Sequence, residues 1–178
     1  MALAVGLAAT SYFMLEARTA RDRAAGEAAK ATAINTFFQE TLGSANPYDG
    51  TGREVTVLEA LDGAVETIDD AFADQPDIRA AVEHTIGSTY RDLGEYDRAE
   101  PLLRSALETK RRLGSGPQAD VATSLNAFGE LFYYQGDVGT AEAPMLREAL
   151  AIRRIVLGDD HPDTGSGMNN LAFVLTRL

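Results

Sequence analysis

The sequence predicts an all-α fold in which pairs of helices stack into a solenoid, preceded by a long N-terminal helix. Two observations lead to this prediction. From residue 77 onward the chain copies itself at a spacing of 42 to 43 residues, and the apolar side chains recur at helical spacing rather than in strand alternation. A single helix pair of this kind cannot bury its apolar face alone, so successive pairs must stack on one another.

The composition limits the class of protein. With 178 residues, 45% hydrophobic and 24% charged, the chain has room for one domain with an extension. It contains no cysteine, which excludes a disulfide framework and a thiolate metal site. The formal net charge is −11, and residues 40–100 alone hold 15 acidic and 4 basic side chains. Because an acidic stretch of this size repels phosphate backbones, we expect no nucleic-acid partner.

Residues 1–15 contain no charged side chain, and Glu16 is the first ionisable one. As a helix this segment would extend roughly 22 Å, which is less than the roughly 30 Å hydrocarbon core of a bilayer. We therefore expect the end of a membrane-spanning helix that begins outside this chain. A signal peptide and the start of a buried helix are the alternatives.

Residues 16–43 are expected to form a helical stalk, because they are rich in Ala, Glu, Arg and Lys and contain no proline. The heptads of this stalk are poor, since Arg21, Asp22 and Gly26 interrupt any apolar stripe. Pairing of residues 16–42 with a second copy, which would give a homo-oligomer, is therefore an alternative rather than the leading interpretation.

The segment 44–54 contains GSANPYDGTG and is typical of a linker. The repeat region is expected from 55 to 178. It begins with one degenerate amphipathic helix over 55–76, in which Leu58, Leu61, Val65, Ile68 and Phe72 share a face.

The repeat is visible residue by residue. GSTYRDLGEYDRAEPLLRSAL (87–107) returns as GELFYYQGDVGTAEAPMLREAL (129–150), with matched positions 42 apart before the inserted Ala143 and 43 apart after it. A third copy opens with DTGSGMNNLAFVL (163–175). The repeats are therefore expected over 77–119 and 120–162 and, in part, over 163–178.

Each copy is expected to contain two helices. Small residues at matched positions, such as Gly87 and Gly129, would let the paired helices approach closely. The stretch LFYYQGD (131–137) resembles a strand and a hairpin turn when read alone, but the repeat assigns it to the end of a first helix. Three aspartates spaced 43 apart are expected to cap helix N-termini: Asp77, Asp120 and Asp163.

The pattern Gly-x-x-Tyr-x-x-x-Gly-x-Tyr-x-x-Ala-Glu-x-x-Leu-x-x-Ala-Leu resembles the tetratricopeptide repeat. The period, the Asn-Asn-Leu-Ala of the third copy and the GDDHPD loop (158–163) are similar to the longer repeats of kinesin light chain. The resemblance covers about residues 77–178. It implies a right-handed superhelical stack whose concave face, lined by the first helix of each repeat, binds a peptide or protein. In repeats of this type, asparagines hold the main chain of a peptide.

Alignment of the copies separates apolar columns from mixed ones. The column of Tyr90, Phe132 and Leu175 is apolar throughout, so we expect it in the core. Columns that accept charged, polar and aromatic residues are expected to face the groove that the resemblance implies, with plain solvent exposure as the alternative. The candidate partner-binding residues are His84, Ser88, Arg91, Asn126, Glu130, Tyr133, Tyr134, Asn169 and Phe173.

The sequence predicts binding rather than catalysis, with no cofactor and no metal site. His161 lies in an acidic loop with no second His or Cys nearby, so we expect a polar turn in which Asp163 caps the next helix. His84 and Ser88 are not accompanied by a Gly-x-Ser-x-Gly elbow. The basic residues 110–112 are expected to interact favourably with a helix C-terminus.

The order of segments resembles the region that follows the kinase domain in bacterial transmembrane serine/threonine kinases. This resemblance implies a kinase domain upstream of Met1, since the chain itself has no Gly-rich phosphate loop, Val-Ala-Ile-Lys, His-Arg-Asp or Asp-Phe-Gly. The expected function is a membrane-anchored scaffold or sensor whose repeats lie outside the cytoplasm, with a cytoplasmic location as the alternative. A free-standing adaptor without a kinase and an oligomerising stalk capped by the repeats are the competing functions.

Overall fold

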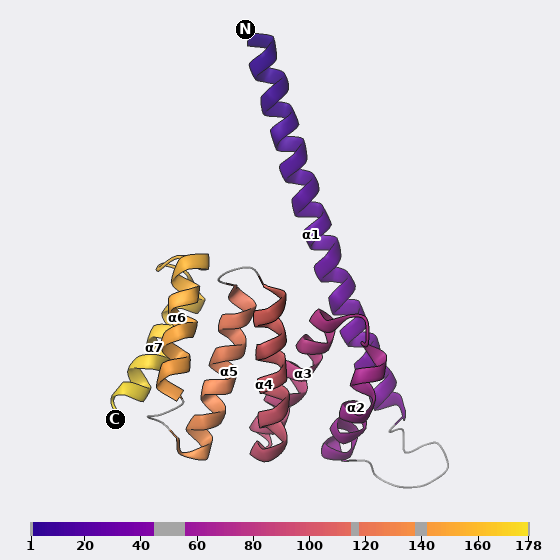
Figure 1. Cartoon of the computed structure of the whole chain (residues 1–178), viewed down its shortest axis with the longest axis vertical. Coiled ribbons are helices and arrows are strands. Elements are labelled where there is room, and N and C mark those ends of the chain that lie inside the picture. Colours follow the sequence, from indigo (N-terminus) through magenta and orange to yellow (C-terminus); the bar gives the residue numbers. More distant parts are fainter. Residues whose placement is uncertain (1, 45–55, 115–117, 138–141, 178) are drawn as a thin grey trace. The chain divides into compact units, whose positions relative to one another are not determined.

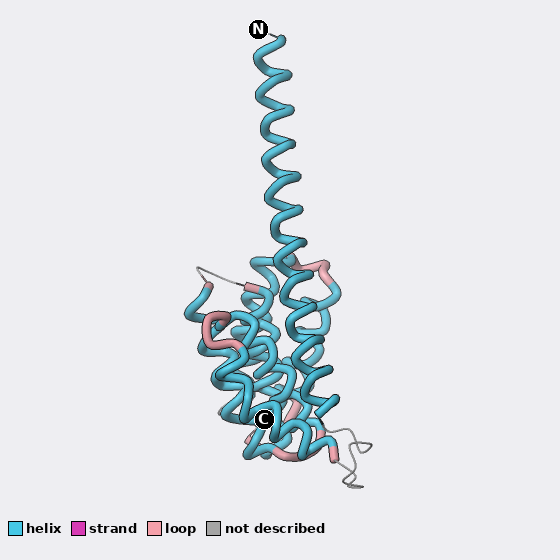
Figure 2. The backbone as a smooth tube through the Cα atoms, turned by 90° about the vertical axis from the view of Figure 1, so that its right-hand side faces the viewer, coloured by secondary structure: helices cyan, strands magenta, loops and turns pink. Residues whose placement is uncertain are grey.

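The computed structural model describes residues 2–44, 56–114, 118–137 and 142–177, with side chains from residue 14 onward except at 23, 42 and 44. These ranges are helical, with short connections and no strand (Figures 1 and 2). The predicted all-α fold is therefore confirmed. The helices are α1 (Ala2–Ser44), α2 (Val57–Ala71), α3 (Pro76–Asp92), α4 (Tyr96–Leu113), α5 (Ala119–Gln135), α6 (Ala143–Leu157) and α7 (Pro162–Leu175).

The chain divides into two compact units, Met1–Ser44 and Ala45–Leu178. The first contains α1, one continuous helix of 43 residues. The boundary predicted between the apolar segment 1–15 and the stalk 16–43 does not interrupt this helix. The linker predicted at 44–54 lies almost wholly outside the described residues. Among the residues that are described, no helix has an apolar stretch long enough to cross a membrane.

The second unit begins with α2, whose start is fixed by a capping box. The Thr56 hydroxyl accepts a hydrogen bond from the Glu59 backbone N–H at 3.2 Å, and the Glu59 carboxylate accepts one from the Thr56 N–H at 2.9 Å. The apolar face of α2 then packs against α3. Its buried residues are Ala60, Leu61, Ala64 and Ile68.

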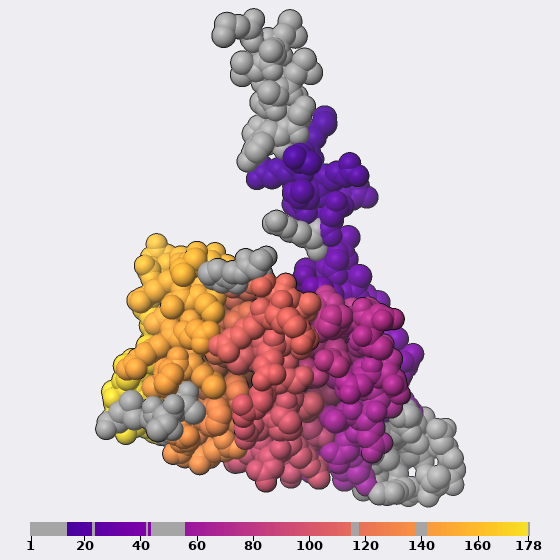
Figure 3. Space-filling view, viewed as in Figure 1, coloured from indigo at the N-terminus to yellow at the C-terminus, as the bar shows by residue number. Residues whose placement is uncertain are grey.

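Two helix pairs follow, α3 with α4 and α5 with α6, and α7 packs against α6. Each element therefore contacts its neighbours in chain order, and in Figure 3 the surface of this unit passes from magenta through orange to yellow. The largest fully buried side chains lie along the interfaces between these helices. They include Tyr90, Ile86, Leu103, Leu125, Leu131, Leu146 and Val174.

Close approach within the first pair depends on Gly87. A Cβ atom at this position would lie 2.9 Å from Cγ of the buried Leu103, closer than packed carbon atoms come. At the matched Gly129 the nearest atom, Cδ2 of Leu146, would lie 3.4 Å away. The small residues that the repeat predicts are thus at helix contacts, but the first contact is the tighter one.

The turns of the two pairs are built alike. Gly94 and Gly136 both follow a first helix and have φ of +82° and +85°. This left-handed conformation costs other residues a steric penalty, so glycine ends the helix at both positions. The stretch at 131–137 is accordingly the last part of α5 and its C-terminal turn, as the repeat predicts.

The predicted capping role of the three aspartates is wrong. Asp77, Asp120 and Asp163 are each the second residue of their helix, after Pro76, Ala119 and Pro162. A carboxylate in the first turn is still favoured there, because the helix N-terminus carries a partial positive charge. For α7 the cap is His161, whose Nδ1 accepts a hydrogen bond from the Asp163 N–H at 3.2 Å.

The apolar column predicted for the core is only partly buried. Tyr90 is 2% exposed and donates a hydrogen bond to Asp62 at 2.6 Å. Phe132 is half-buried beside Phe128, with 4.9 Å between ring centroids. For Leu175 the prediction is wrong, since this residue is 42% exposed. Among the described helices none follows α7, so nothing in that part of the chain covers this position.

Candidate functional site

The nine predicted binding residues lie on the first helices of the repeats, which together form what we call the first-helix face. This face consists of α3, α5 and α7. The structure brings six of the nine into direct contact with one another or with an adjacent first helix. His84 and Ser88 lie further toward the start of the stack, on α3.

A polar network runs across all three helices of this face. Arg91 Nη1 on α3 donates to Glu130 Oε2 at 2.6 Å and to the Ala127 carbonyl at 3.3 Å. Asn126 Nδ2 donates to the other oxygen of Glu130 at 2.7 Å. The Asn126 carbonyl oxygen in turn accepts from Asn170 Nδ2 on α7 at 3.2 Å. The network links the three helices through side chains of three predicted columns, those of Arg91, Asn126 and Glu130.

Two details differ from the sequence alignment. Asn169, which the alignment matches to Asn126, is exposed, and the neighbouring Asn170 makes the contact instead. Arg91 was expected to be exposed, but its side chain is only 12% exposed because it reaches across to α5. The Asn-Asn doublet in the sequence was the only signal for Asn170, and the repeat offset chose the wrong member.

Aromatic residues gather at the C-terminal end of α5. The rings of Tyr133 and Phe173 are 5.8 Å apart, and those of Tyr133 and Tyr134 are 5.4 Å apart. Tyr134 also stacks on Tyr96 of α4, with 5.9 Å between ring centroids. Tyr134 and Phe173 are 54% and 49% exposed, so this cluster presents large aromatic surfaces to solvent.

Arg177, just beyond α7, covers part of this cluster. Its guanidinium lies 4.2 Å from the Phe173 ring centroid and 5.2 Å from that of Tyr133. It also donates a hydrogen bond to the Tyr133 hydroxyl. Aromatic faces attract cations at such distances. This contact is not among those expected from the sequence.

A pocket of about 190 Å³ opens beside the aromatic cluster, between α5, α6 and α7. Glu142, directly before α6, forms part of its wall and is 3% exposed. Burial raises the pKa of Glu142 to about 7, the charge of Arg177 opposes this rise, and the charge of Glu130 adds to it. The pocket is lined by Glu130, Tyr133, Tyr134, Glu142, Leu146, Asn170, Phe173 and Val174.

His84 is half-buried rather than open to the groove. Its Nδ1 atom is buried and has no hydrogen-bond partner. Burial, together with the smaller effect of the charges of Lys110 and Arg91, lowers the pKa of His84 to about 4. This imidazole is therefore neutral near pH 7. Lys110 itself donates to the Ser124 hydroxyl at 3.0 Å, so this member of the basic run binds across to α5.

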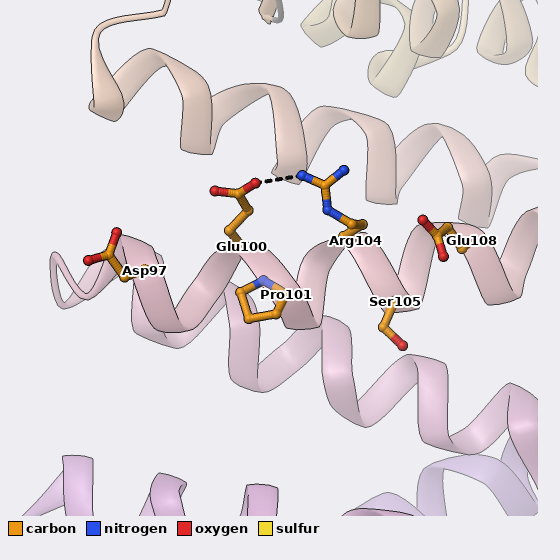
Figure 4. Close-up of a pocket in the computed structure, with 6 residues that line it drawn as sticks. All are labelled: Asp97, Glu100, Pro101, Arg104, Ser105 and Glu108. Atoms are coloured by element: carbon orange, nitrogen blue, oxygen red, sulfur yellow. Dashed lines mark hydrogen bonds and ion pairs between the residues drawn. The ribbon is translucent and has the colours of Figure 1, made fainter.

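The second helices offer a contrasting surface. A hollow of about 340 Å³ lies along α4. Figure 4 shows the residues that line it, all on this one helix, with Glu100 and Arg104 paired with each other. Ser105 points toward α3 and donates to the Glu83 carboxylate at 2.9 Å. The residues that line the hollow are Asp97, Glu100, Pro101, Arg104, Ser105 and Glu108. Since all of its lining residues belong to α4, substitutions there are suited to be controls for substitutions on the first-helix face.

Comparison with known proteins agrees with the repeat. Residues 78–145 match the tetratricopeptide repeat family. Over 102 residues the chain is 29% identical to a clustered mitochondria protein homolog of Neosartorya fischeri. That match covers 56% of this chain and 7% of the relative, so the chain corresponds to a small part of that protein.

A solved structure is also similar. The crystal structure of BtubC (BKLC) from P. vanneervenii superposes with a TM-score of 0.56 and 30% sequence identity. The similarity covers 65% of this chain and 49% of that one. The helix pairs, the glycine turns, the matched repeat and this structural similarity together show that the chain contains tetratricopeptide repeats.

Proposed function

We propose that this chain is a non-catalytic interaction module that binds an extended segment of a protein or peptide along the first-helix face. Tetratricopeptide repeats form protein–protein interaction scaffolds, and they are generally non-catalytic. The proposal adds the location of the binding surface and the form of the ligand.

The observation that carries the proposal is the combination at the end of α5 and on α7. Exposed aromatic surfaces at Tyr134 and Phe173 flank a pocket, and the amides of Asn126 and Asn170 lie on the same face. Aromatic anchors beside pockets supply much of the free energy of peptide and protein binding. A side-chain amide has two N–H donors and an acceptor oxygen, which suits it to the main chain of an extended peptide.

The proposal can be tested with peptides selected on the protein. A display library of short random peptides is panned against the full chain, and affinities of selected peptides are measured by fluorescence anisotropy. We expect Asn126→Ala/Tyr133→Ala to weaken binding by about tenfold or more, because it removes an amide and an aromatic anchor. The control Arg104→Ala/Glu108→Ala changes exposed side chains on α4 and should leave affinity unchanged.

Two results would count against this location. One is that Asn126→Ala/Tyr133→Ala binds the selected peptides as the wild type does. The other is that the α4 variant, Arg104→Ala/Glu108→Ala, loses binding instead. Circular dichroism spectra and melting curves of both variants establish that each remains folded.

We further propose that the module is the membrane-proximal scaffold or sensor region of a bacterial serine/threonine kinase, anchored through residues 1–15. This proposal is supported by the order of segments and by the absence of charge in 1–15. The repeats would lie outside the cytoplasm. The test is flotation of the full chain and of residues 16–178 with phospholipid vesicles. Flotation of both or of neither would contradict anchoring through 1–15.

The competing functions have their own tests. A kinase catalytic loop encoded upstream of Met1 would favour the kinase setting, and its absence would favour a free-standing adaptor. For an oligomerising stalk, the sedimentation of residues 16–178 is compared with that of residues 50–178. Equal monomeric masses would remove this role from residues 16–42.

A further inference from the structure

The pocket beside the aromatic cluster has a chemical character that follows from the single residue inserted in the second repeat. Pro101 and Leu103 of α4 correspond to Pro144 and Leu146 of α6, 43 residues later. Counting back four residues from each leucine gives Ala99 in the first repeat and Glu142 in the second. The insertion of Ala143 has thus put a carboxylate where the first repeat has a small apolar side chain.

One oxygen of this buried carboxylate has no hydrogen-bond partner. Ala99 is fully buried, and Glu142 is only 3% exposed. The Oε2 atom of Glu142 is inaccessible to solvent and accepts no hydrogen bond. A buried charge without a partner is costly, and structures normally pair it. The pocket that Glu142 lines is therefore short of one positive or hydrogen-bond-donating group.

The other walls of the pocket also suit a cation. The rings of Tyr133, Tyr134 and Phe173 line it, and their faces carry partial negative charge. The second carboxylate, Glu130, already has both oxygens engaged by Arg91 and Asn126. Glu142 is thus the carboxylate of this wall whose charge is not offset by a hydrogen bond to Oε2, and a cation in the pocket would be attracted to it.

An internal cation already demonstrates the attraction. The guanidinium of Arg177 rests on Phe173 and Tyr133, and it donates to the Tyr133 hydroxyl. Its charge lowers the raised pKa of Glu142, but burial still dominates. Arg177 therefore covers the rings without satisfying the buried carboxylate.

We propose that this pocket binds the cationic side chain, a guanidinium or an ammonium group, of a basic residue in the bound segment, and that Arg177 occupies the ring faces until that cation displaces it. This inference rests on the proposed function and specifies the partner as a basic segment. The net charge of −11, concentrated in residues 40–100, would attract such a segment to the protein.

The experiment titrates the isotopically labelled full chain with N-acetyl-arginine amide and follows backbone amide resonances by NMR. N-acetyl-citrulline amide is the matched probe, since it has nearly the same shape without the charge. For a fragment of this size we expect a Kd on the order of 1–10 mM for the arginine probe. The shifts should centre on Glu142, Tyr133 and Phe173, and the citrulline probe should produce no saturable shift.

Two variants of the pocket and two control variants on α4 sharpen the test. Glu142→Gln should weaken arginine binding at least fivefold, and Arg177→Ala should strengthen it several-fold, because it vacates the ring faces. The matched controls, Glu100→Gln and Arg104→Ala, change the corresponding pair on α4 and should leave the Kd unchanged. Equal binding of the citrulline probe, or unchanged binding to Glu142→Gln, would overturn the proposal.

The pH dependence gives a second readout. The guanidinium stays charged throughout, so arginine binding should strengthen from pH 6 to pH 8 as Glu142 ionises. The charged groups that influence Glu142 are Glu130 on α5, itself paired with Arg91 of α3, and Arg177 beyond α7. In Glu142→Gln this dependence should vanish, and its persistence there would contradict the role of Glu142.

Failure of this inference is distinguishable from failure of the proposed function. If selected peptides lose affinity in Asn126→Ala/Tyr133→Ala while N-acetyl-arginine amide does not bind wild type or Arg177→Ala, the first-helix face binds segments without a cation pocket. If the selected peptides instead bind on α4, the proposed function fails, whether or not the small probe binds.

Discussion

The first and second repeats share a backbone design but differ in what their helix interfaces contain. In the first, Gly87 packs directly on Leu103, and Ala99 and Tyr90 are buried between the helices. In the second, the contact at Gly129 is looser, and a glutamate occupies the position of Ala99. The first interface is therefore filled by closely packed apolar side chains. The second contains a buried carboxylate and borders an aromatic and acidic pocket. A repeat can thus acquire a pocket without a change in its turns or its stacking order.

The largest expected effect compares the two central leucines. Leu103→Ala should lower the free energy of unfolding by about 3 kcal/mol, because it leaves a cavity in a fully buried interface. Leu146→Ala should cost less, since Leu146 lines the open pocket and water or neighbouring side chains can fill the space. Urea denaturation monitored by circular dichroism measures both. Equal costs would show that the second interface is packed as tightly as the first.

The two glycines provide the next comparison. Gly87→Ala should destabilise the protein by roughly 1–3 kcal/mol, because its Cβ would clash with Leu103. Gly129→Ala should be neutral or stabilising by up to about 1 kcal/mol, since the Cβ has space and alanine favours the helix. The same denaturation experiment applies. A stable Gly87→Ala variant would contradict the difference in packing.

Glu142 should make the second repeat sensitive to pH. Because its pKa is raised, the folded state holds the proton more tightly than the unfolded state, and stability falls as pH rises from about 4.5 to about 7. Glu142→Gln should therefore raise Tm by about 2–4 °C at pH 8, equivalent to about 1 kcal/mol, and change it little at pH 5. Glu100→Gln, at the exposed pair on α4, should show no such pH-dependent gain.

Substitution of His84 should have the smallest effect on stability near neutral pH. In acid, the dependence of stability on pH that His84 causes should have the opposite sign to that of Glu142. The pKa of His84 is lowered in the folded state. As pH falls from about 6.5 to about 4, the His84 imidazole is therefore protonated in the unfolded state but still neutral in the folded state. Stability from this residue is present above that window and lost within it. Comparing wild type with His84→Gln from pH 7 to pH 4 tests this, since the variant should lose less stability. Parallel curves would contradict it.

Sequence reasoning succeeded where the backbone alone decides the outcome. The period, the glycine turns at Gly94 and Gly136 and the close contact at Gly87 follow from residue size and conformational preference. It failed where side chains of different repeats meet. The offset selected Asn169 instead of Asn170, and it placed Leu175 in the core although no described helix covers it.

The same limitation explains why Glu142 and Arg177 were missed as site residues. In the alignment, Glu142 matched Glu100, whose carboxylate pairs with Arg104 on the outer side of α4. The insertion of one residue before Pro144 turns that position by about 100° around the helix axis. Such a rotation moves a side chain from solvent to the interface. An alignment that matches residues by identity, as it matches Glu142 to Glu100, does not reveal this rotation.

The 43 residues of α1 also have a mechanical consequence. A straight α-helix of this length is a rod of about 65 Å without an internal joint. Each residue added to or removed from such a helix changes its length by about 1.5 Å and turns one end by about 100° about the helix axis. Within α1 itself, the separation of the two ends and the rotation between them are therefore set by how many residues the helix contains.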